Sequence, residues 1–197
     1  MLGRSEEIKE LRELYKSNKA EFVAIYGIRK LGKTELVETA FENDFAFKFQ
    51  ALSPDKFDKA EIETAQLKSF GDSLETYGLS NVESPEDWHE AFSQLKDLLE
   101  AKGDGKRQIV FIDNLQCLKT GGSGFADALG DFWKNWGAAN DNLMLIVCSC
   151  TWMLDKLASK KDSFYSMTTR DFSLHNPSLE VARAFYIAKA NRIDGKE

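Results

Sequence analysis

The sequence has few of the residues that build disulfide frameworks, metal clusters or membrane spans. It contains three cysteines, two histidines and three prolines in 197 residues. An odd number of cysteines argues against a disulfide framework, and two histidines are too few for a histidine-based metal centre. No apolar run approaches the roughly 20 residues that span a bilayer, and the N-terminal segment lacks the apolar core of a signal peptide. We therefore expect a cytoplasmic protein with no membrane partner.

The composition is that of a folded, acidic protein. Hydrophobic residues make up 43% of the chain and charged residues 29%, with a net charge of −6. This apolar content excludes intrinsic disorder, and the length favours one domain, with or without an appendage. The acidic balance excludes a protein that coats nucleic acids through general basicity, although a local basic patch stays open. We expect no direct binding of nucleic acid.

Apolar runs alternate with amphipathic stretches along the chain, which predicts an α/β fold with a mainly parallel sheet. Strands are predicted over 21–26, 45–50, 108–113, 143–150 and 170–174. Helices are predicted over 5–17, 33–43, 58–77, 84–102, 123–139, 152–158 and from about 178. Ser5 is the expected N-cap of the first helix, and Ser84 that of the fourth, with Pro85 at the first helical position. Cys148 and Cys150 are expected on one face of a strand as buried thiols, with a metal or redox role as the alternative.

A glycine-rich loop lies between the first predicted strand and the second predicted helix. Residues 27–34, GIRKLGKT, match G-x-x-x-x-G-K-[ST], the P-loop pattern of proteins that bind nucleoside triphosphates. Its glycines allow the backbone amides to approach a phosphate at a helix N-terminus. Lys33 can then reach the β- and γ-phosphates, and the Thr34 hydroxyl can ligate Mg²⁺. The alternative is a fortuitous glycine turn. The predicted nucleotide-binding residues here are Gly27, Ile28, Arg29, Lys30, Leu31, Gly32, Lys33, Thr34 and Glu35.

A second acidic element follows the strand QIVFID, which ends at Asp113. An aspartate at the end of an apolar strand is the Walker B pattern, so Asp113 is the predicted second metal-binding residue beside Thr34. It lies 80 positions after Lys33, which leaves room for intervening elements and favours a sheet in which these two strands are not neighbours. The alternative is an aspartate that only caps the next turn.

The residue after Asp113 bears on catalysis. P-loop enzymes in which these two strands are not neighbours usually have a glutamate there that deprotonates the attacking water. This chain has Asn114 at that position. A carboxamide binds water and cannot take its proton, so slow hydrolysis is expected. Gln116 could orient a water. At the end of the strand 143–150, Ser149 is a possible γ-phosphate sensor or simply a turn residue.

Taken together, five segments resemble the archaeal-type ATPases of prokaryotes, which are AAA-related and allied to the STAND class. The segments are LGRSEEIKELRELY, GIRKLGKTELV, FIDNLQCL, SGFADALGDFWKNW and IVCSCTWMLDKL. The resemblance covers about residues 2–180. It implies a three-layer P-loop NTPase sandwich that binds ATP and Mg²⁺ at the loops after the strands. It also implies that Gly3 and Arg4 lie near the adenine.

The chain departs from the family pattern at three places. Residues 111–117 read FIDNLQC where family members read FIDELPW, and residues 148–153 are shorter than the family's C-G-S-x-x-S-W-M segment. The family's arginine after the next tyrosine is replaced by Met167, with Arg170 the nearest substitute. Methionine cannot supply charge to a γ-phosphate, so the sensing of that group is in question.

The resemblance implies an ATPase core over residues 1–176, with 177–197 as a C-terminal helix that begins a lid. The first hypothesis is an ATP-binding switch with weak or impaired hydrolysis. The alternatives are an active ATPase that couples hydrolysis to partner or DNA-associated domains, and an interaction module without turnover. A protein partner or self-association fits each of them, and the sequence leaves ATP against GTP open.

Overall fold

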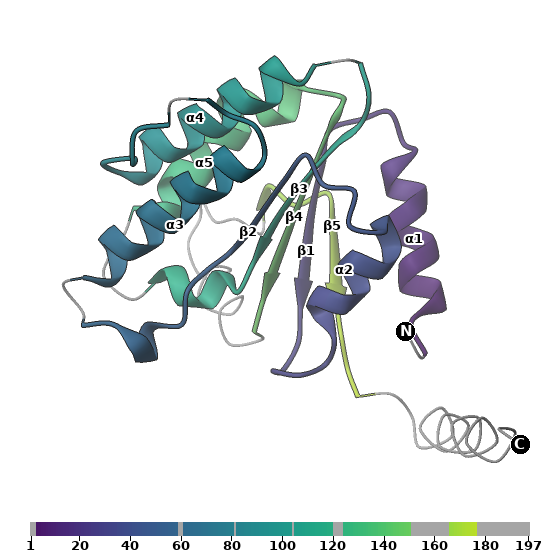
Figure 1. Ribbon diagram of the computed structural model, residues 1–197. Coiled ribbons are helices and arrows are strands. Elements are labelled where there is room, and N and C mark those ends of the chain that lie inside the picture. The colour runs from purple at the N-terminus through teal and green to yellow at the C-terminus, as the bar shows by residue number, and fades with distance from the viewer. Residues whose placement is uncertain are drawn as a thin grey trace, which may run out of the picture.

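The computed structural model describes residues 3–58, 61–80, 82–103, 105–119, 124–150 and 166–176. Within them the chain folds as an α/β protein around one five-stranded sheet (Figure 1). The strands are β1 (Glu21–Tyr26), β2 (Phe47–Gln50), β3 (Gln108–Asp113), β4 (Leu143–Ser149) and β5 (Arg170–Ser173). The α-helices are α1 (Ser5–Tyr15), α2 (Lys33–Phe41), α3 (Ile62–Thr76), α4 (Trp88–Ala101) and α5 (Phe125–Asn135). Short 3₁₀ helices cover η1 (Pro54–Lys56), η2 (Leu115–Lys119) and η3 (Gly137–Ala139). The helices expected over 152–158 and from about 178 lie outside the described residues.

The sheet order is β2-β3-β4-β1-β5, and every pairing is parallel. Strand β4 therefore lies between β1 and β3, with Ile25 opposite Cys148 and Ile112 opposite Val147. This confirms that the strand before the glycine-rich loop and the strand that ends at Asp113 are not neighbours. Because the strands are parallel, all their carboxyl ends lie at one edge of the sheet, the lower edge in Figure 1. Ligands of open α/β sheets bind at that edge.

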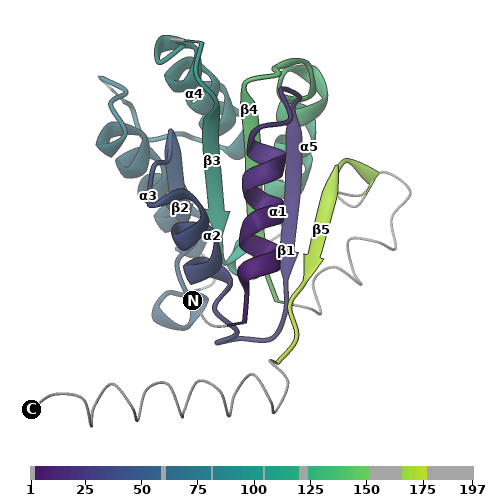
Figure 2. The same cartoon turned by 90° about the vertical axis from the view of Figure 1, so that its right-hand side faces the viewer.

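Helices cover both faces of the sheet, which makes three layers (Figures 1 and 2). Helices α1 and α2 pack on one face and α3, α4 and α5 on the other, each over its own buried apolar cluster. Strands β1, β3 and β4 are buried along almost their whole length because both faces are covered. The predicted three-layer fold class is confirmed. Within the described ranges, no helix is both long and apolar enough to cross a bilayer.

Two predicted N-caps are wrong, the first by one residue and the second by three. Ser5 is already inside α1, whose N-cap is Arg4. Helix α4 begins at Trp88, and the Oδ1 atom of Asp87 accepts a hydrogen bond of 2.9 Å from the Glu90 amide. This aspartate satisfies a first-turn N–H group that would otherwise lack a partner, so the helix starts at that cap.

The two cysteines near the end of β4 do not share a face. Cys148 packs in the cluster under α1 and α2, and Cys150 packs in the cluster under α3, α4 and α5. The alternation of a strand holds only while the strand continues, and β4 ends at Ser149. Both side chains are buried and outside any disulfide, as is that of Cys117.

Candidate functional site

The glycine-rich loop connects the carboxyl end of β1 to the first residue of α2. Two of its residues have left-handed backbone angles, with φ of 68° at Lys30 and 78° at Gly32. Gly27 is required for a different reason. A Cβ atom there would lie 2.6 Å from the backbone oxygen of Leu174, just past β5. The loop thus turns tightly and brings the N-terminus of α2 to the carboxyl edge of the sheet, where an anion is favoured.

Lys33 is held inside its own loop. Its Nζ atom donates to the backbone oxygens of Gly27 at 2.8 Å and Ile28 at 2.9 Å. These two hydrogen bonds hold the ammonium group against the backbone at the start of the loop.

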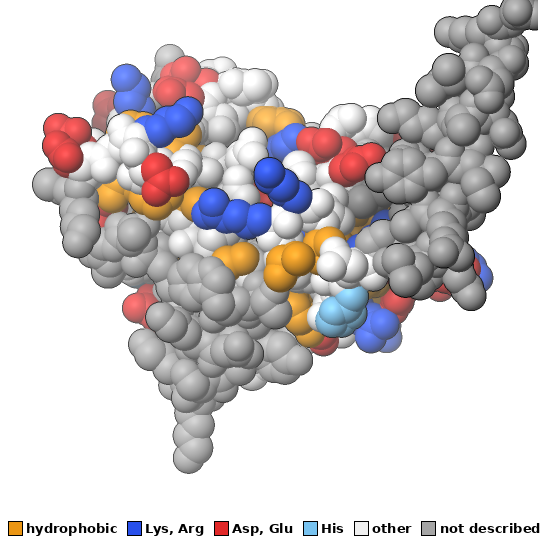
Figure 3. All heavy atoms as spheres, turned by 90° about the horizontal axis from the view of Figure 1, so that it is seen from below, with side chains coloured by type: hydrophobic (Ala, Val, Ile, Leu, Met, Phe, Trp, Pro, Cys, Tyr) orange, Lys and Arg blue, Asp and Glu red, His pale blue; other side chains and the backbone are white. Residues whose placement is uncertain are grey.

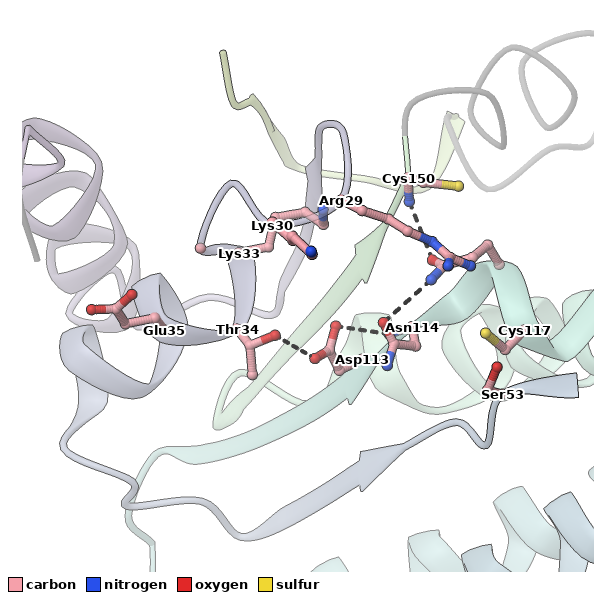
Figure 4. Close-up of a pocket in the computed structure, with 12 residues that line it drawn as sticks. Arg29, Lys30, Lys33, Thr34, Glu35, Ser53, Asp113, Asn114, Cys117 and Cys150 are labelled. Atoms are coloured by element: carbon pink, nitrogen blue, oxygen red, sulfur yellow. Dashed lines mark hydrogen bonds between the residues drawn. The ribbon is translucent and has the colours of Figure 1, made fainter. Parts of the chain in front are cut away.

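Thr34 and Asp113 meet at the same edge from different elements. Thr34 Oγ1 donates a hydrogen bond of 2.6 Å to Asp113 Oδ2, and the Asp113 side chain is buried (Figure 4). A hydroxyl and a carboxylate are hard oxygen ligands of the kind that Mg²⁺ prefers, usually together with water and substrate phosphates. In the described part of the chain no group of three or more His, Cys, Asp and Glu side chains forms a metal centre. The donor set thus fits Mg²⁺ held between two side chains and a phosphate, and it does not fit an all-protein cage.

A cavity of about 470 Å³ opens beside this pair. Its lining combines three cationic side chains with two acidic ones and several neutral polar groups. The lining residues are Arg29, Lys30, Gly32, Lys33, Thr34, Glu35, Ser53, Asp113, Asn114, Gln116, Cys117 and Cys150. Figure 3, which views this edge from below, shows lysine and arginine side chains across the middle of the face. In a chain with net charge −6, this local excess of positive charge favours an anionic ligand.

Asn114 follows Asp113 with a left-handed backbone, φ 58°. Asparagine tolerates this conformation better than most residues do. Its amide nitrogen donates to Asp113 Oδ1 at 2.7 Å, and its side-chain Oδ1 accepts from Gln116 Nε2 at 3.2 Å. Both carboxylate oxygens of Asp113 are therefore already in hydrogen bonds, one with Thr34 and one with Asn114.

Gln116, in η2, connects the ends of two strands. Its Oε1 atom accepts from the Cys150 amide at 3.2 Å and from Ser149 Oγ at 3.5 Å. The side chain of Ser149 is buried and does not line the cavity, and its contact with Gln116 connects this candidate sensor to the cavity lining. The sequence left the placement of Gln116 open.

Sequence reasoning missed three lining residues, Ser53, Cys117 and Cys150. Ser53 could have been found, because it follows β2 and the carboxyl ends of parallel strands share one edge. Burial raises the pKa of the Cys117 thiol, and the charge of Arg29 partly offsets this rise. The thiol is therefore protonated at neutral pH and offers no thiolate nucleophile.

Several predicted residues lie away from the cavity. Gly27, Ile28 and Leu31 do not line it, although the backbone oxygens of the first two hold Lys33. Glu35 lines the cavity, but its carboxylate points away from Asp113 (Figure 4).

The chain's N-terminal pair is also outside the cavity lining. Arg4 is buried at the start of α1, where its guanidinium donates to the backbone oxygen of His175 at 2.6 Å and to Glu7 at 2.9 Å. Gly3 is exposed beside it. Arg4 thus joins α1 to the segment after β5, at the edge of the sheet that carries the loop.

The two residues weighed for γ-phosphate sensing have other contacts. Met167 is half-buried and packs against the cluster under α3, α4 and α5. Arg170, on β5, forms an ion pair of 2.6 Å with Glu10 of α1. Neither residue lines the cavity, whose cationic groups are Arg29, Lys30 and Lys33.

Comparisons with known proteins agree with this geometry. A model of the ATPase domain found predominantly in Archaea matches residues 1–170. An uncharacterized protein of Methanocaldococcus jannaschii is 34% identical over 97 residues, which are 49% of this chain and 20% of that protein. The Walker-type ATPase of Pyrococcus abyssi superposes with a TM-score of 0.63 at 18% identity, over 98% of this chain and 59% of that one. Cdc6p from Pyrobaculum aerophilum gives 0.63 at 13% identity, over 96% and 50%.

The two solved structures show a shared fold, because their sequence identity to this chain is low. The chain spans a fifth of the length of the Methanocaldococcus protein and between half and three fifths of the two solved proteins. The family match covers most of the chain, and it includes the loop 27–34 and Asp113. With a parallel sheet, a phosphate-type loop and an acidic strand end at one edge, the chain belongs to the family of ATPase domains found predominantly in Archaea.

Proposed function

We propose that this domain binds Mg·ATP at the loop 27–34 and works as a nucleotide-dependent switch with slow hydrolysis. The observation that carries the proposal is the position of Asn114. Asn114 directly follows Asp113 in the chain and lines the same cavity as Asp113 and Thr34. A carboxylate that activates water would be needed at this position.

Binding is supported by the loop and the helix behind it. The backbone amides of the loop and the N-terminus of α2 would hold the phosphates, with Lys33 leaving its carbonyl partners to pair with phosphate oxygens. Thr34 and Asp113 would hold Mg²⁺, which when bound neutralises charge on the β- and γ-phosphates. ATP as the nucleotide is part of the proposal, and the match to a family of ATPase domains supports it.

Slow hydrolysis is supported by the hydrogen bonds and the orientation of the two carboxylates that line the cavity. The carboxylates that line it in the described residues are Glu35 and Asp113. Asp113 uses both oxygens in hydrogen bonds, and Glu35 points away from it. Asn114 can bind a water molecule but cannot remove its proton. The nucleotide would therefore stay bound as the triphosphate long enough to act as a signal to attached domains or to a partner.

The extent of the functional unit is also a proposal. Residues 1–176 would form the nucleotide-binding core, and 177–197 would begin a lid. Strand β5 supports this boundary for the core, since it pairs with β1 and its ion pair with α1 closes that side.

The test separates binding from turnover. Calorimetry should show Mg-dependent binding of ATP by the unmodified chain and its loss in Lys33→Ala. Lys134→Ala removes the same charge from the exposed surface of α5 and should bind normally. Turnover should be slow in the unmodified chain and faster in Asn114→Glu. Asn114→Asp also introduces a carboxylate, and aspartate tolerates the left-handed φ of 58° at this position. This variant therefore controls for the backbone strain that glutamate would add.

Two results would contradict the proposal. Rapid turnover by the unmodified chain would exclude impaired hydrolysis. ATP binding that is absent, or unchanged in Lys33→Ala, would exclude the loop as the nucleotide site.

A further inference from the structure

The orientation of the Gln116 side chain follows from its partners. A backbone N–H group can only donate, so the Gln116 atom that faces the Cys150 amide at 3.2 Å must be the acceptor Oε1. The other end of the carboxamide is then the Nε2 group, which can only donate. It faces the side chain of Asn114 at 3.2 Å (Figure 4).

The same reasoning fixes Asn114. Because Gln116 presents a donor, the Asn114 atom that faces it must be the acceptor Oδ1. The Nδ2 group is then at the other end of the amide, and within the described part of the chain it has no hydrogen-bond partner. Asn114 lines the cavity with Lys33 and Thr34, so the group that it has left for a ligand is a donor.

We propose that Gln116 is a positioning residue that holds the Asn114 amide with its donor group available to the nucleotide, so that the site binds a triphosphate better than a diphosphate. This inference rests on the proposed function. A γ-phosphate offers anionic acceptors to Asn114 Nδ2, whereas a diphosphate has no group at that position. Hydrogen bonds to charged acceptors are stronger than those to neutral acceptors. An Asn114 amide that faces the nucleotide with its donor therefore favours the triphosphate over the diphosphate.

Gln116 also connects this selectivity to the end of β4. Its Oε1 atom accepts from Cys150, the residue directly after the strand. A γ-phosphate that draws Asn114 toward itself would act through Gln116 on the backbone of Cys150. The bound triphosphate and Cys150 would thus be linked by three hydrogen bonds, one from Asn114 Nδ2 to the phosphate and two through Gln116.

Substitution of Gln116 by glutamate tests the orientation. Glutamate has nearly the same shape and still accepts from Cys150, but it has no donor for Asn114 Oδ1. The Asn114 amide must then turn so that Nδ2 faces the new carboxylate, and its acceptor Oδ1 faces the nucleotide. We expect the preference for the slowly hydrolysed analogue ATPγS over ADP to fall about tenfold, the size expected for one hydrogen bond to a charged group. The affinity for ADP, measured in the same protein, should change little.

A double-mutant cycle separates orientation from the added charge. In an Asn114→Ala background the charge of Gln116→Glu is still present but there is no amide to turn, so the substitution should no longer alter the ATPγS-to-ADP ratio. Gln50→Glu adds the same charge at the exposed end of β2, at the same edge of the sheet, and should leave the ratio unchanged. Without nucleotide, the side-chain amide resonances of Asn114 should shift in Gln116→Glu, because Nδ2 gains a partner.

Three outcomes would overturn the inference. The first is an equal loss of ATPγS and ADP affinity in Gln116→Glu. The second is a fall in the ATPγS-to-ADP ratio on Gln116→Glu that is as large in the Asn114→Ala background as in the unmodified chain. The third is an Asn114 amide resonance that does not shift. In each case Lys33-dependent ADP binding would still support the proposed function. If no nucleotide binds at all, the proposed function fails and this inference fails with it.

Discussion

Thr34 and Asp113 lie 79 positions apart in the sequence, and in the fold a hydrogen bond of 2.6 Å joins their side-chain oxygens. One comes from the first turn of α2 and the other from the last residue of β3. Strand β4 lies between β1 and β3, so the loop after β1 must reach across the end of β4 to bring them together. The pair therefore depends on the order of strands in the sheet as well as on the two motifs.

This pair predicts a metal-dependent loss of affinity. Thr34→Ala should weaken ATP binding about tenfold in the presence of Mg²⁺, because one oxygen ligand and its hydrogen bond are removed. Without Mg²⁺ the variant and the unmodified chain should bind ATP alike. Thr34→Ser keeps the hydroxyl and is the matched control. Calorimetry with and without Mg²⁺ checks this, and an equal loss in both conditions would argue against a metal role for Thr34.

Gly27 predicts a loss of stability that comes from close packing. An added Cβ would lie 2.6 Å from the Leu174 oxygen, so Gly27→Ala should lower the free energy of unfolding by about 1–3 kcal/mol. Gly130→Ala is the control, because in α5 the new Cβ would meet only the flexible end of Met167 at 3.3 Å. A helical glycine replaced by alanine should gain up to about 1 kcal/mol. Urea unfolding of both variants measures the contrast, and equal stabilities would refute it.

The aromatic cluster under α3 and α4 predicts a large effect at Phe70. This ring is fully buried and contacts Phe47, Phe49, Trp88 and Phe92, with the Trp88 ring at 5.7 Å and 86°. Phe70→Ala should cost about 3–5 kcal/mol, since it removes buried apolar surface and leaves a cavity. Ile28→Ala should change stability by less than about 0.5 kcal/mol, because Ile28 is 56% exposed. Chemical denaturation would show the prediction to be wrong if the two variants were alike.

The thiol of Cys148 predicts a decrease of stability at high pH. Burial raises its pKa well above the ordinary value of 9.0. Above that value the unfolded chain loses the proton while the folded chain keeps it. Each pH unit in this window should therefore lower the free energy of unfolding by up to about 1.4 kcal/mol. Below it the contribution of the group is constant.

The comparison of slopes checks the Cys148 prediction. Cys148→Ala should be less stable than the unmodified chain at neutral pH and should show a flatter decline above 9.0. The difference between the two slopes is the informative quantity, because Tyr77 also has a raised pKa from burial and contributes to the decline in both proteins. Parallel slopes would mean that Cys148 ionises as readily in the folded protein as in the unfolded chain.

Much of the fold could be predicted from the sequence because its signals are local. The apolar runs of β1 and β3 are found with the predicted bounds, and the loop 27–34 begins and ends as the motif requires. Helix starts were less predictable. Ser84 and Pro85 look like a cap, but Asp87 is the residue whose carboxylate accepts a first-turn amide, and several polar residues compete for that role.

The sequence by itself determined the class of site: a loop that can hold phosphate, a hydroxyl and a carboxylate that can hold a metal, and an amide at the position after them. Only the tertiary structure decided how Asn114 presents that amide. The backbone amide of Cys150, just after β4, fixes the orientation of the Gln116 side chain, and Gln116 in turn fixes that of Asn114. The tertiary structure also placed Arg170 against Glu10 and not at the cavity. Local patterns fix backbone conformation, whereas the partners of a side chain depend on which strands lie side by side, and that is settled by packing of the whole sheet.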